Sequence, residues 1–175
     1  MTLTQEQFIQ AALLEFERPL VGYAYGYLRD WDRARDVVQD TFIRLCQQDQ
    51  AKVRDALKTW LYTVCRNRAL DVLRKEARMV EMDEQKLLRV PSEKPSPAQA
   101  FDSQEVRQKL DEALERLTPH QREVIVLKFQ QGLSYEEISR VTGLSSGNVG
   151  FLLHHGLKRL REWLPREWST PSTPL

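Results

Sequence analysis

Residues 133–162 read LSYEEISRVTGLSSGNVGFLLHHGLKRLRE, two short amphipathic segments on either side of a glycine. Ser134 is followed three residues later by a glutamate, the spacing of a capping box that starts a helix. Gly143 suits the left-handed residue that ends this helix, and Ser145 or Ser146 can cap the next one. The stretch therefore predicts a helix-turn-helix, whose second helix usually enters the major groove of DNA by its first turns. A plain pair of packed helices is the alternative.

The second helix of this pair is poor in cations at its start. The arginines that most often contact guanine are missing there, and basic residues come only later in the helix. Late cations can meet phosphates, which position a protein without telling sequences apart. Phe151 can touch a thymine methyl group or, with Leu152, cover a neighbouring helix, and both interpretations stay open. The predicted duplex-contacting residues are Ser145, Ser146, Asn148, Gly150, Phe151, His154, His155, Lys158 and Arg159.

Apolar residues recur at spacings of three and four along most of the chain, which has only seven glycines among its 175 residues. This period is that of amphipathic helices, and no alternating strand pattern competes with it. We expect a first helix over residues 4–16, a second that begins at Pro19, a third capped by Asp30 or Asp32, and a fourth over residues 56–78. The predicted fold class is all-α.

A change of composition divides the chain into two small helical domains. Residues 81–101 contain three prolines, many charges and few large apolar side chains, as a flexible linker does. We therefore expect one helical domain over residues 1–80 and a second over residues 102–165. The prolines and polar residues of the segment 166–175 predict a disordered tail.

The composition excludes several classes of protein. Cys46 and Cys65 stand alone, so they form neither a disulfide framework nor a metal site, and we expect both to be buried on helices. His120, His154 and His155 are too few and poorly placed for catalysis, and no phosphate-binding glycine loop is present. We expect no enzyme activity, no cofactor and no metal. Because no stretch approaches the roughly 18 apolar residues of a membrane span, we expect a cytoplasmic protein without membrane insertion.

Three stretches together resemble a known family. Residues 30–42, DWDRARDVVQDTF, and 60–78, WLYTVCRNRALDVLRKEAR, are similar to region 2 of the extracytoplasmic-function (ECF) sigma factors of the sigma-70 family. These are the small promoter-specificity subunits of bacterial RNA polymerase. Residues 113–145, ALERLTPHQREVIVLKFQQGLSYEEISRVTGLS, look like region 4 of the same family. The blocks stand in the family's order and cover most of the chain.

The resemblance implies that the helix with the D-x-x-Q-D-x-F pattern binds the β′ clamp helices of core RNA polymerase, with the β flap as a further contact. The pattern makes physical sense, because aspartates four residues apart line one helical face and can pair with basic residues of a partner. Arg35 stands where the family usually has an acid. A merely solvated acidic face is the alternative. The residues implied in polymerase binding are Asp32, Asp36, Gln39, Asp40 and Phe42.

The resemblance also places the capture of the promoter −10 strand on the fourth helix. Residues 58–78 hold six basic residues against two acidic ones, and single-stranded DNA is held by cations along its backbone and by aromatic faces or pockets for its bases. The preceding loop, residues 47–54, would close over a flipped base but has no aromatic residue. Trp60 continues the apolar stripe, so it is also a core candidate. The implied residues are Lys58, Trp60, Tyr62, Arg66, Asn67, Arg68, Asp71, Arg74 and Lys75.

The resemblance thus implies a promoter-specificity subunit that binds core polymerase, recognises the −35 element as duplex and captures the melted −10 strand. An anti-sigma factor is a further implied partner. Two alternatives stay open. The first is a helix-turn-helix regulator that acts without polymerase, although residues 1–100 show no ligand-sensing or dimerisation motif. The second is a sigma-like protein whose region 4 mainly binds a regulatory protein through Phe151 and Leu152.

Overall fold

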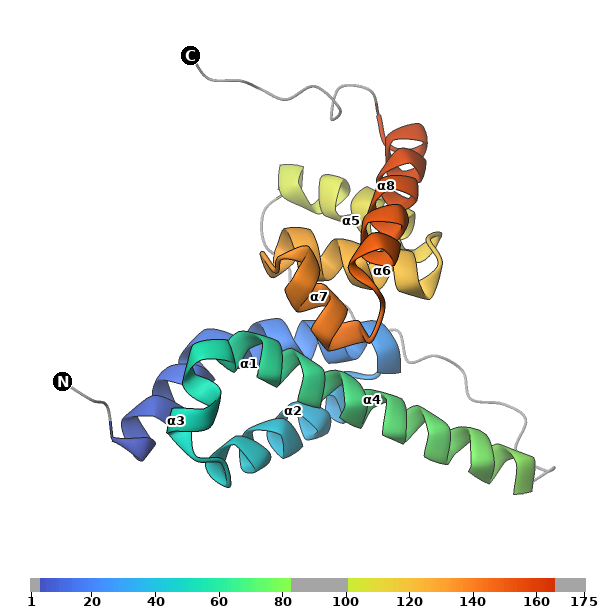
Figure 1. Ribbon diagram of the computed structural model, residues 1–175. Coiled ribbons are helices and arrows are strands. Elements are labelled where there is room, and N and C mark those ends of the chain that lie inside the picture. The colour runs from blue at the N-terminus through green and yellow to red at the C-terminus, as the bar shows by residue number, and fades with distance from the viewer. Residues whose placement is uncertain (1–3, 83–100, 166–175) are drawn as a thin grey trace, which may run out of the picture. The chain divides into compact units, whose positions relative to one another are not determined.

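The structure is a computed structural model that describes residues 4–82 and 101–165. The chain divides into two compact units, Met1–Glu93 and Lys94–Leu175, each described here by itself. All regular elements in the described ranges are helices, which confirms the predicted fold class (Figure 1). Residues 83–100 of the predicted linker and the predicted tail lie outside the described residues.

The first unit is a bundle of three long helices with a short helical connection. Its elements are α1 (Gln5–Leu28), α2 (Trp31–Cys46), α3 (Gln50–Val53), the 3-10 turn η1 (Arg54–Ala56) and α4 (Leu57–Met82). Helices α1, α2 and α4 pack against one another (Figure 1). Between them lie Leu20, Leu45, Leu61 and Tyr62, whose side chains are fully buried.

Helix α1 corrects the predicted break near Pro19. Pro19 lies inside one continuous helix, which starts with a capping box at Thr4. An interior proline costs about 3 kcal/mol, because it removes a hydrogen bond and its ring clashes with the preceding turn. The apolar stripe keeps its phase on both sides of the proline, and burial of each large apolar side chain returns about 1.5–3 kcal/mol. The buried residues of the stripe are Phe8, Ala12, Phe16, Leu20, Tyr23, Ala24 and Leu28.

Asp30, one of the two predicted candidates, caps α2. Its carboxylate accepts the backbone N–H groups of Asp32 and Arg33 at 2.9 and 3.1 Å. The cap satisfies two of the donors that a helix start leaves free, and its negative charge suits the positive end of the helix dipole. It therefore fixes where α2 begins.

The connection between α2 and α4 differs from the predicted open loop. It contains the short helix α3, capped by Asp49, in which Gln50 and Val53 are buried. The expectation that both cysteines are buried holds for one of them. Cys65 is fully buried, whereas Cys46 is exposed because it is the last residue of α2, one position past the buried Leu45.

The second unit holds the predicted helix-turn-helix. Its elements are α5 (Phe101–Glu115), α6 (Pro119–Ile125), the π-helical segment η2 (Val126–Gln130), α7 (Tyr135–Thr142) and α8 (Ser146–Trp163). The capping box at Ser134 is present, Gly143 adopts the left-handed conformation with φ of 75°, and Ser145, one of the two predicted candidates, caps α8. The π-helical segment was not predicted.

Helix α8 packs on α5, α6 and α7 (Figure 1). Gly156 of α8 lies close to α6, because an added Cβ atom would be 2.8 Å from the Cδ1 atom of Ile125. Any larger residue at this position would therefore require the side chain of Ile125 to shift. Within residues 4–82 and 101–165, no helix is long and apolar enough to span a membrane.

Candidate polymerase and nucleic-acid interfaces

The acidic face of α2 is less uniform than its sequence suggests. Asp32 lies 3.7 Å from the guanidinium group of Arg35, so part of its charge is neutralised. Asp40 is ion-paired with Arg68 of α4. Asp36 is exposed and has no ion-pair partner among the described residues. It is thus the carboxylate of this face that stays free for a partner's cation.

The Asp40–Arg68 pair joins two residues that were predicted to serve different partners. The side chain of Arg68 is 27% exposed and reaches from α4 to α2 instead of pointing into solvent. Its Nε atom is buried and has no hydrogen-bond partner among the residues that the structure describes. Leaving such a donor unsatisfied costs about 1–3 kcal/mol. In the folded unit the charge of Arg68 is thus already engaged by Asp40, and its contact with DNA stays a prediction.

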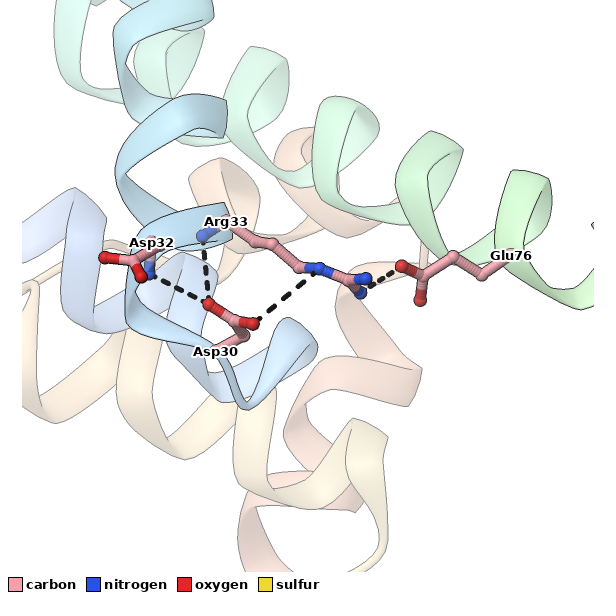
Figure 2. Close-up of polar contacts among 4 residues, drawn as sticks. All are labelled: Asp30, Asp32, Arg33 and Glu76. Carbon is pink, nitrogen blue, oxygen red and sulfur yellow. Dashed lines mark hydrogen bonds and ion pairs between the residues drawn. The ribbon is translucent and has the colours of Figure 1, made fainter. Parts of the chain in front are cut away.

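A second ion pair crosses between the same helices with the charges reversed. Figure 2 shows Arg33 of α2 extended between Asp30, at the start of its own helix, and Glu76 on α4. The Nε atom of Arg33 lies 3.7 Å from the Asp30 carboxylate. Neither Arg33 nor Glu76 was among the predicted site residues, because no local pattern indicates a pair between two residues so far apart in the chain.

The two pairs fix the register of α4 on α2. Residues 33 and 40 are seven apart on α2, and their partners 76 and 68 are eight apart on α4 in the opposite direction. Both intervals are about two helical turns, so the two residues of each helix lie on one face and at matching heights along the antiparallel pair. A slip by one turn would break both pairs at once. The complementary charges at matching intervals were the only signal in the sequence.

Four of the remaining predicted −10 residues lie in the middle of α4. Asp71 lies four residues after Asn67, and Arg74 and Lys75 lie three and four residues after Asp71, so the four residues form one stripe. Asn67 and Lys75 are exposed, and Arg74 contacts Asp71 at 3.2 Å. Lys58, Trp60 and Arg66 are partly buried. An amide flanked by cations on one open face is suited to hold a DNA strand and the edge of a base.

Two aromatic residues of the predicted interfaces belong to the core instead. Tyr62 is fully buried, and its ring makes an edge contact with Tyr23 at 5.1 Å between centroids. Burial raises the pKa of the Tyr62 hydroxyl well above its usual range. Phe42 is 6% exposed. The predicted direct roles of Tyr62 and Phe42 are corrected, because both act by packing behind the surfaces.

Helix α8 presents most of its predicted residues to solvent. The hydroxyl group of Ser145 accepts the backbone N–H of Asn148 at 3.2 Å, so this serine is used as a cap. Gly150 is half-buried, and a Cβ atom added to it would lie 3.5 Å from the ring of Tyr135. Arg159 donates a long hydrogen bond of 3.4 Å to Gln121. Exposed along the helix are Ser146, Asn148, Phe151, His154, His155, Lys158 and Arg159.

Phe151 and the two histidines form an aromatic cluster on this surface. The ring centroids of Phe151 and His155 are 4.2 Å apart, and those of His154 and His155 are 5.4 Å apart in an edge arrangement. Tyr135 at the start of α7 was missed by sequence analysis. It is 44% exposed, and the ammonium group of Lys128 lies over its ring at 5.4 Å. No group of histidine, cysteine and acidic residues among the described residues could hold a metal ion.

The two units coincide with two conserved regions of one family. Residues 13–79 match the family description "Sigma-70 region 2", and residues 107–160 match "Sigma-70, region 4". The sigma factor CarQ of Myxococcus xanthus is 30% identical over 145 residues, which are 82% of this chain and 81% of CarQ. The chain belongs to the ECF sigma factors. This sigma factor is also 34% identical over 147 residues to the ECF sigma factor SigE of Mycolicibacterium smegmatis, and these residues are 83% of the chain but only 57% of SigE.

A solved structure agrees with the fold of the sigma factor. The sigma factor RpoE in complex with the anti-sigma factor NepR, from Bartonella quintana, superposes with a TM-score of 0.66 at 27% identity. The match covers 88% of this chain and 94% of RpoE. The region 2 match runs from α1 into α4, and the region 4 match runs from α5 through most of α8.

Proposed function

We propose that this sigma factor is the promoter-specificity subunit of a bacterial RNA polymerase. It binds core polymerase through α2, captures the melted −10 strand on α4 and holds the −35 duplex with α8. One observation carries the proposal. The free acid of α2 and the polar, cationic stripe of α4 lie on separate open faces of two helices that ion pairs lock in register. Docking of α2 on polymerase therefore orients α4.

Contact with polymerase centres on Asp36. An exposed carboxylate with no partner in residues 4–82 and 101–165 can meet a cation of the β′ clamp helices without first breaking an existing pair. Asp32 contributes less, since Arg35 already lies beside it. The β flap is the proposed partner of the second unit.

Capture of the −10 strand uses the open stripe of α4. Opening a duplex costs about 1.4 kcal/mol per base-pair step, and each base captured on a protein surface returns about 1–3 kcal/mol. A few captured bases therefore offset a few opened steps, and polymerase contacts supply the remainder. Asn67 can read the edge of a flipped base, and Lys75 can meet the backbone beside it.

The proposed role also bears on enzyme activity, location, domain boundaries and a regulatory partner. A subunit that positions promoter DNA has no catalytic residues of its own, so we propose that the sigma factor is not an enzyme. It acts in the cytoplasm, where the chromosome and polymerase meet. The proposed domains are residues 1–80 and 102–165, with a linker over 81–101 and a tail over 166–175. RpoE was solved with an anti-sigma factor, and we propose such a partner here as well.

The test is co-elution of the purified chain with bacterial core RNA polymerase in size-exclusion chromatography. The wild type is expected to co-elute, and Asp36→Arg is expected to lose the complex because it places a cation against a cation. Glu17→Arg is the matched control, an equal charge reversal on the exposed surface of α1. If the wild type does not co-elute, the polymerase role is wrong and a regulator that acts without polymerase takes its place. If the wild type co-elutes and both variants behave alike, the polymerase role stands and the contact through Asp36 is wrong.

The −10 assignment needs a separate measurement. In the reconstituted holoenzyme, Asn67→Ala is expected to slow promoter opening, followed by permanganate reactivity of unpaired thymines, while co-elution with core polymerase is unchanged. Loss of co-elution in this variant would place Asn67 in the polymerase contact instead.

A further inference from the structure

The exposed face of α8 is divided into a neutral half and a cationic half. The first two turns carry Ser146, Asn148 and Phe151 and no formal charge. Cations begin two turns later, at Lys158 and Arg159. Because a recognition helix usually enters the major groove by its N-terminal residues, the neutral half meets the bases and the cationic half meets phosphates.

Phe151 is the most prominent side chain of the neutral half. It is 59% exposed, and its neighbours Gly147 and Gly150 have no side chains that could cover it. The ring of His155, one turn further along, supports it at 4.2 Å. An exposed phenyl ring held by a neighbour loses little additional freedom when it contacts a ligand. Phe151 thus presents a rigidly held apolar ring on the exposed face of α8.

The side chains available in this half favour one kind of base pair. Asn148 lies three residues before Phe151, on the same stripe of the helix, and its amide makes no hydrogen bond within the described residues. An asparagine amide pairs with the N6 and N7 atoms of adenine, and an apolar side chain contacts the methyl group of thymine. Guanine is read mainly by arginine or lysine, and neither occurs between residues 145 and 157.

We propose that Phe151 determines specificity by packing against the C5-methyl group of a thymine in the −35 element, beside an adenine read by Asn148. The inference rests on the proposed function, since it requires α8 to enter the −35 duplex. The neutral half of α8 thus selects A·T pairs, whereas Lys158 and Arg159 bind any sequence.

The charge of the helix argues for DNA as the occupant of this surface. The aromatic cluster is followed within the next two turns by three cations, Lys158, Arg159 and Arg161. A ligand that contacts Phe151 and continues along the helix therefore meets positive charge, which favours an anionic ligand such as DNA. A regulatory protein bound over Phe151 is the other outcome of the experiment below.

The experiment uses the full chain in holoenzyme with bacterial core polymerase. Duplexes randomised across the −35 region are selected by binding, and the recovered sequence is made again with each thymine replaced in turn by deoxyuridine, which lacks only the methyl group. The ratio of the two affinities is measured for the wild type, Phe151→Ala and the matched control Phe129→Ala. Phe129 is a 61% exposed phenylalanine outside α8.

At one thymine the wild type is expected to bind the deoxyuridine duplex about fourfold more weakly, the equivalent of one buried methyl group. Phe151→Ala should bind both duplexes equally, and Phe129→Ala should keep the wild-type ratio. A ratio of one at every position in the wild type, or an unchanged ratio in Phe151→Ala, overturns the inference. So does a selected element without thymine.

Failure of the proposed function would look different. A chain that forms no holoenzyme disproves the polymerase role and, with it, the thymine contact. If holoenzyme forms but selects no −35 sequence, the polymerase role stands while duplex readout by α8, including Phe151, is wrong. In that case Phe151 would serve a protein partner.

Discussion

Arg68 of α4 is ion-paired with Asp40 of α2, and its buried Nε atom has no hydrogen-bond partner within the described part of the chain. Sequence motifs assign Asp40 to the polymerase and Arg68 to DNA, yet in the folded chain each neutralises the other. The same two helices are joined again by Arg33 and Glu76 (Figure 2). Part of the charge of a sigma factor of this kind therefore sets the helix register before any partner arrives.

Asp40 is expected to matter for stability, whereas Asp36 is not. Asp40→Ala leaves the mostly buried guanidinium group of Arg68 without its counter-charge and should lower the free energy of unfolding by about 1–2 kcal/mol, less than for a fully buried pair because Asp40 is partly solvated. Asp36→Ala should change it by less than about 0.5 kcal/mol, as exposed substitutions usually do. Urea unfolding followed by circular dichroism measures both.

Exchange of the two charges provides the control. Asp40→Arg combined with Arg68→Asp should recover part of the stability that either substitution loses alone, because the pair is restored with opposite polarity. Equal stability of Asp40→Ala and Asp36→Ala would show that the pair contributes nothing to the fold.

Arg35 is expected to weaken the contact with polymerase. It is exposed and lies 3.7 Å from Asp32, so it reduces the negative potential of the face that meets the polymerase cations. Arg35→Ala should raise the affinity for core polymerase about twofold to threefold at low salt, with a smaller gain at high salt, because the effect is electrostatic. Fluorescence anisotropy of a labelled chain measures it. Arg18→Ala, on the exposed surface of α1, should change nothing, and an equal gain there would attribute the effect to net charge alone.

The local features of this fold could be predicted from the sequence, and the tertiary ones could not. The helix-turn-helix depends on Ser134, Gly143 and a serine cap within a dozen residues, so its chemistry is readable from neighbours in the chain. Pro19 was misread because its local preference for a first turn is outweighed by packing of the whole stripe of α1.

The site shows the same division. Asn67 and Lys75 are exposed, as their predicted contacts with DNA require, and Phe151, for which the sequence left two interpretations open, is exposed as well. Tyr62 and Arg68 are not, and spacing cannot distinguish the face of α4 that meets α1 and α2 from the face that meets solvent. Which face of α4 is buried depends on where the other helices pack, and no local motif indicates this.

Gly156 and Gly147 are expected to respond oppositely to the same substitution. Gly156→Ala forces a Cβ atom to within 2.8 Å of Ile125 and should lower the free energy of unfolding by about 1–3 kcal/mol, although alanine favours helix. Gly147, in the first turn of the same helix, has no atom within 4 Å of an added Cβ. Gly147→Ala should therefore stabilise the chain by up to about 1 kcal/mol. Thermal unfolding of both variants tests the crossing of α6 and α8, and a neutral Gly156→Ala would contradict it.

The two cysteines should differ in reactivity and in their effect at alkaline pH. Cys46 is exposed and should react with a thiol reagent in the native chain, whereas Cys65 should react only after unfolding. Burial raises the pKa of the Cys65 thiol to about 12, although a hydrogen bond with Thr41 lowers it somewhat. The neutral thiol is thus favoured in the folded state. Its contribution to stability is complete below the unfolded pKa, about 8.5, and is lost as pH rises towards 12.

The measurable quantity is the pH dependence of unfolding. Between pH 9 and pH 10.5, one such group lowers the free energy of unfolding by up to about 1.4 kcal/mol per pH unit. Cys65→Ala should show a shallower decline than the wild type, even if it is less stable at every pH. Cys46→Ala should keep the wild-type slope. A slope in Cys65→Ala equal to that of the wild type would mean that another group, such as the buried Tyr62, causes the whole decline.

Lys158 and Phe151 should separate the two kinds of contact made by α8. A lysine that meets a phosphate releases counterions, so its removal reduces the slope of log affinity against log salt by about 0.9. Lys158→Gln in holoenzyme should therefore bind −35 duplexes more weakly at low salt, lose less affinity as salt is added, and prefer the same bases as the wild type. Phe151→Ala should lower affinity for its preferred duplex and leave the salt slope unchanged, because no charge is lost. If Lys158→Gln alters base preference while the slope stays the same, Lys158 reads a base, and the division of α8 into a neutral reading half and a cationic anchoring half is wrong.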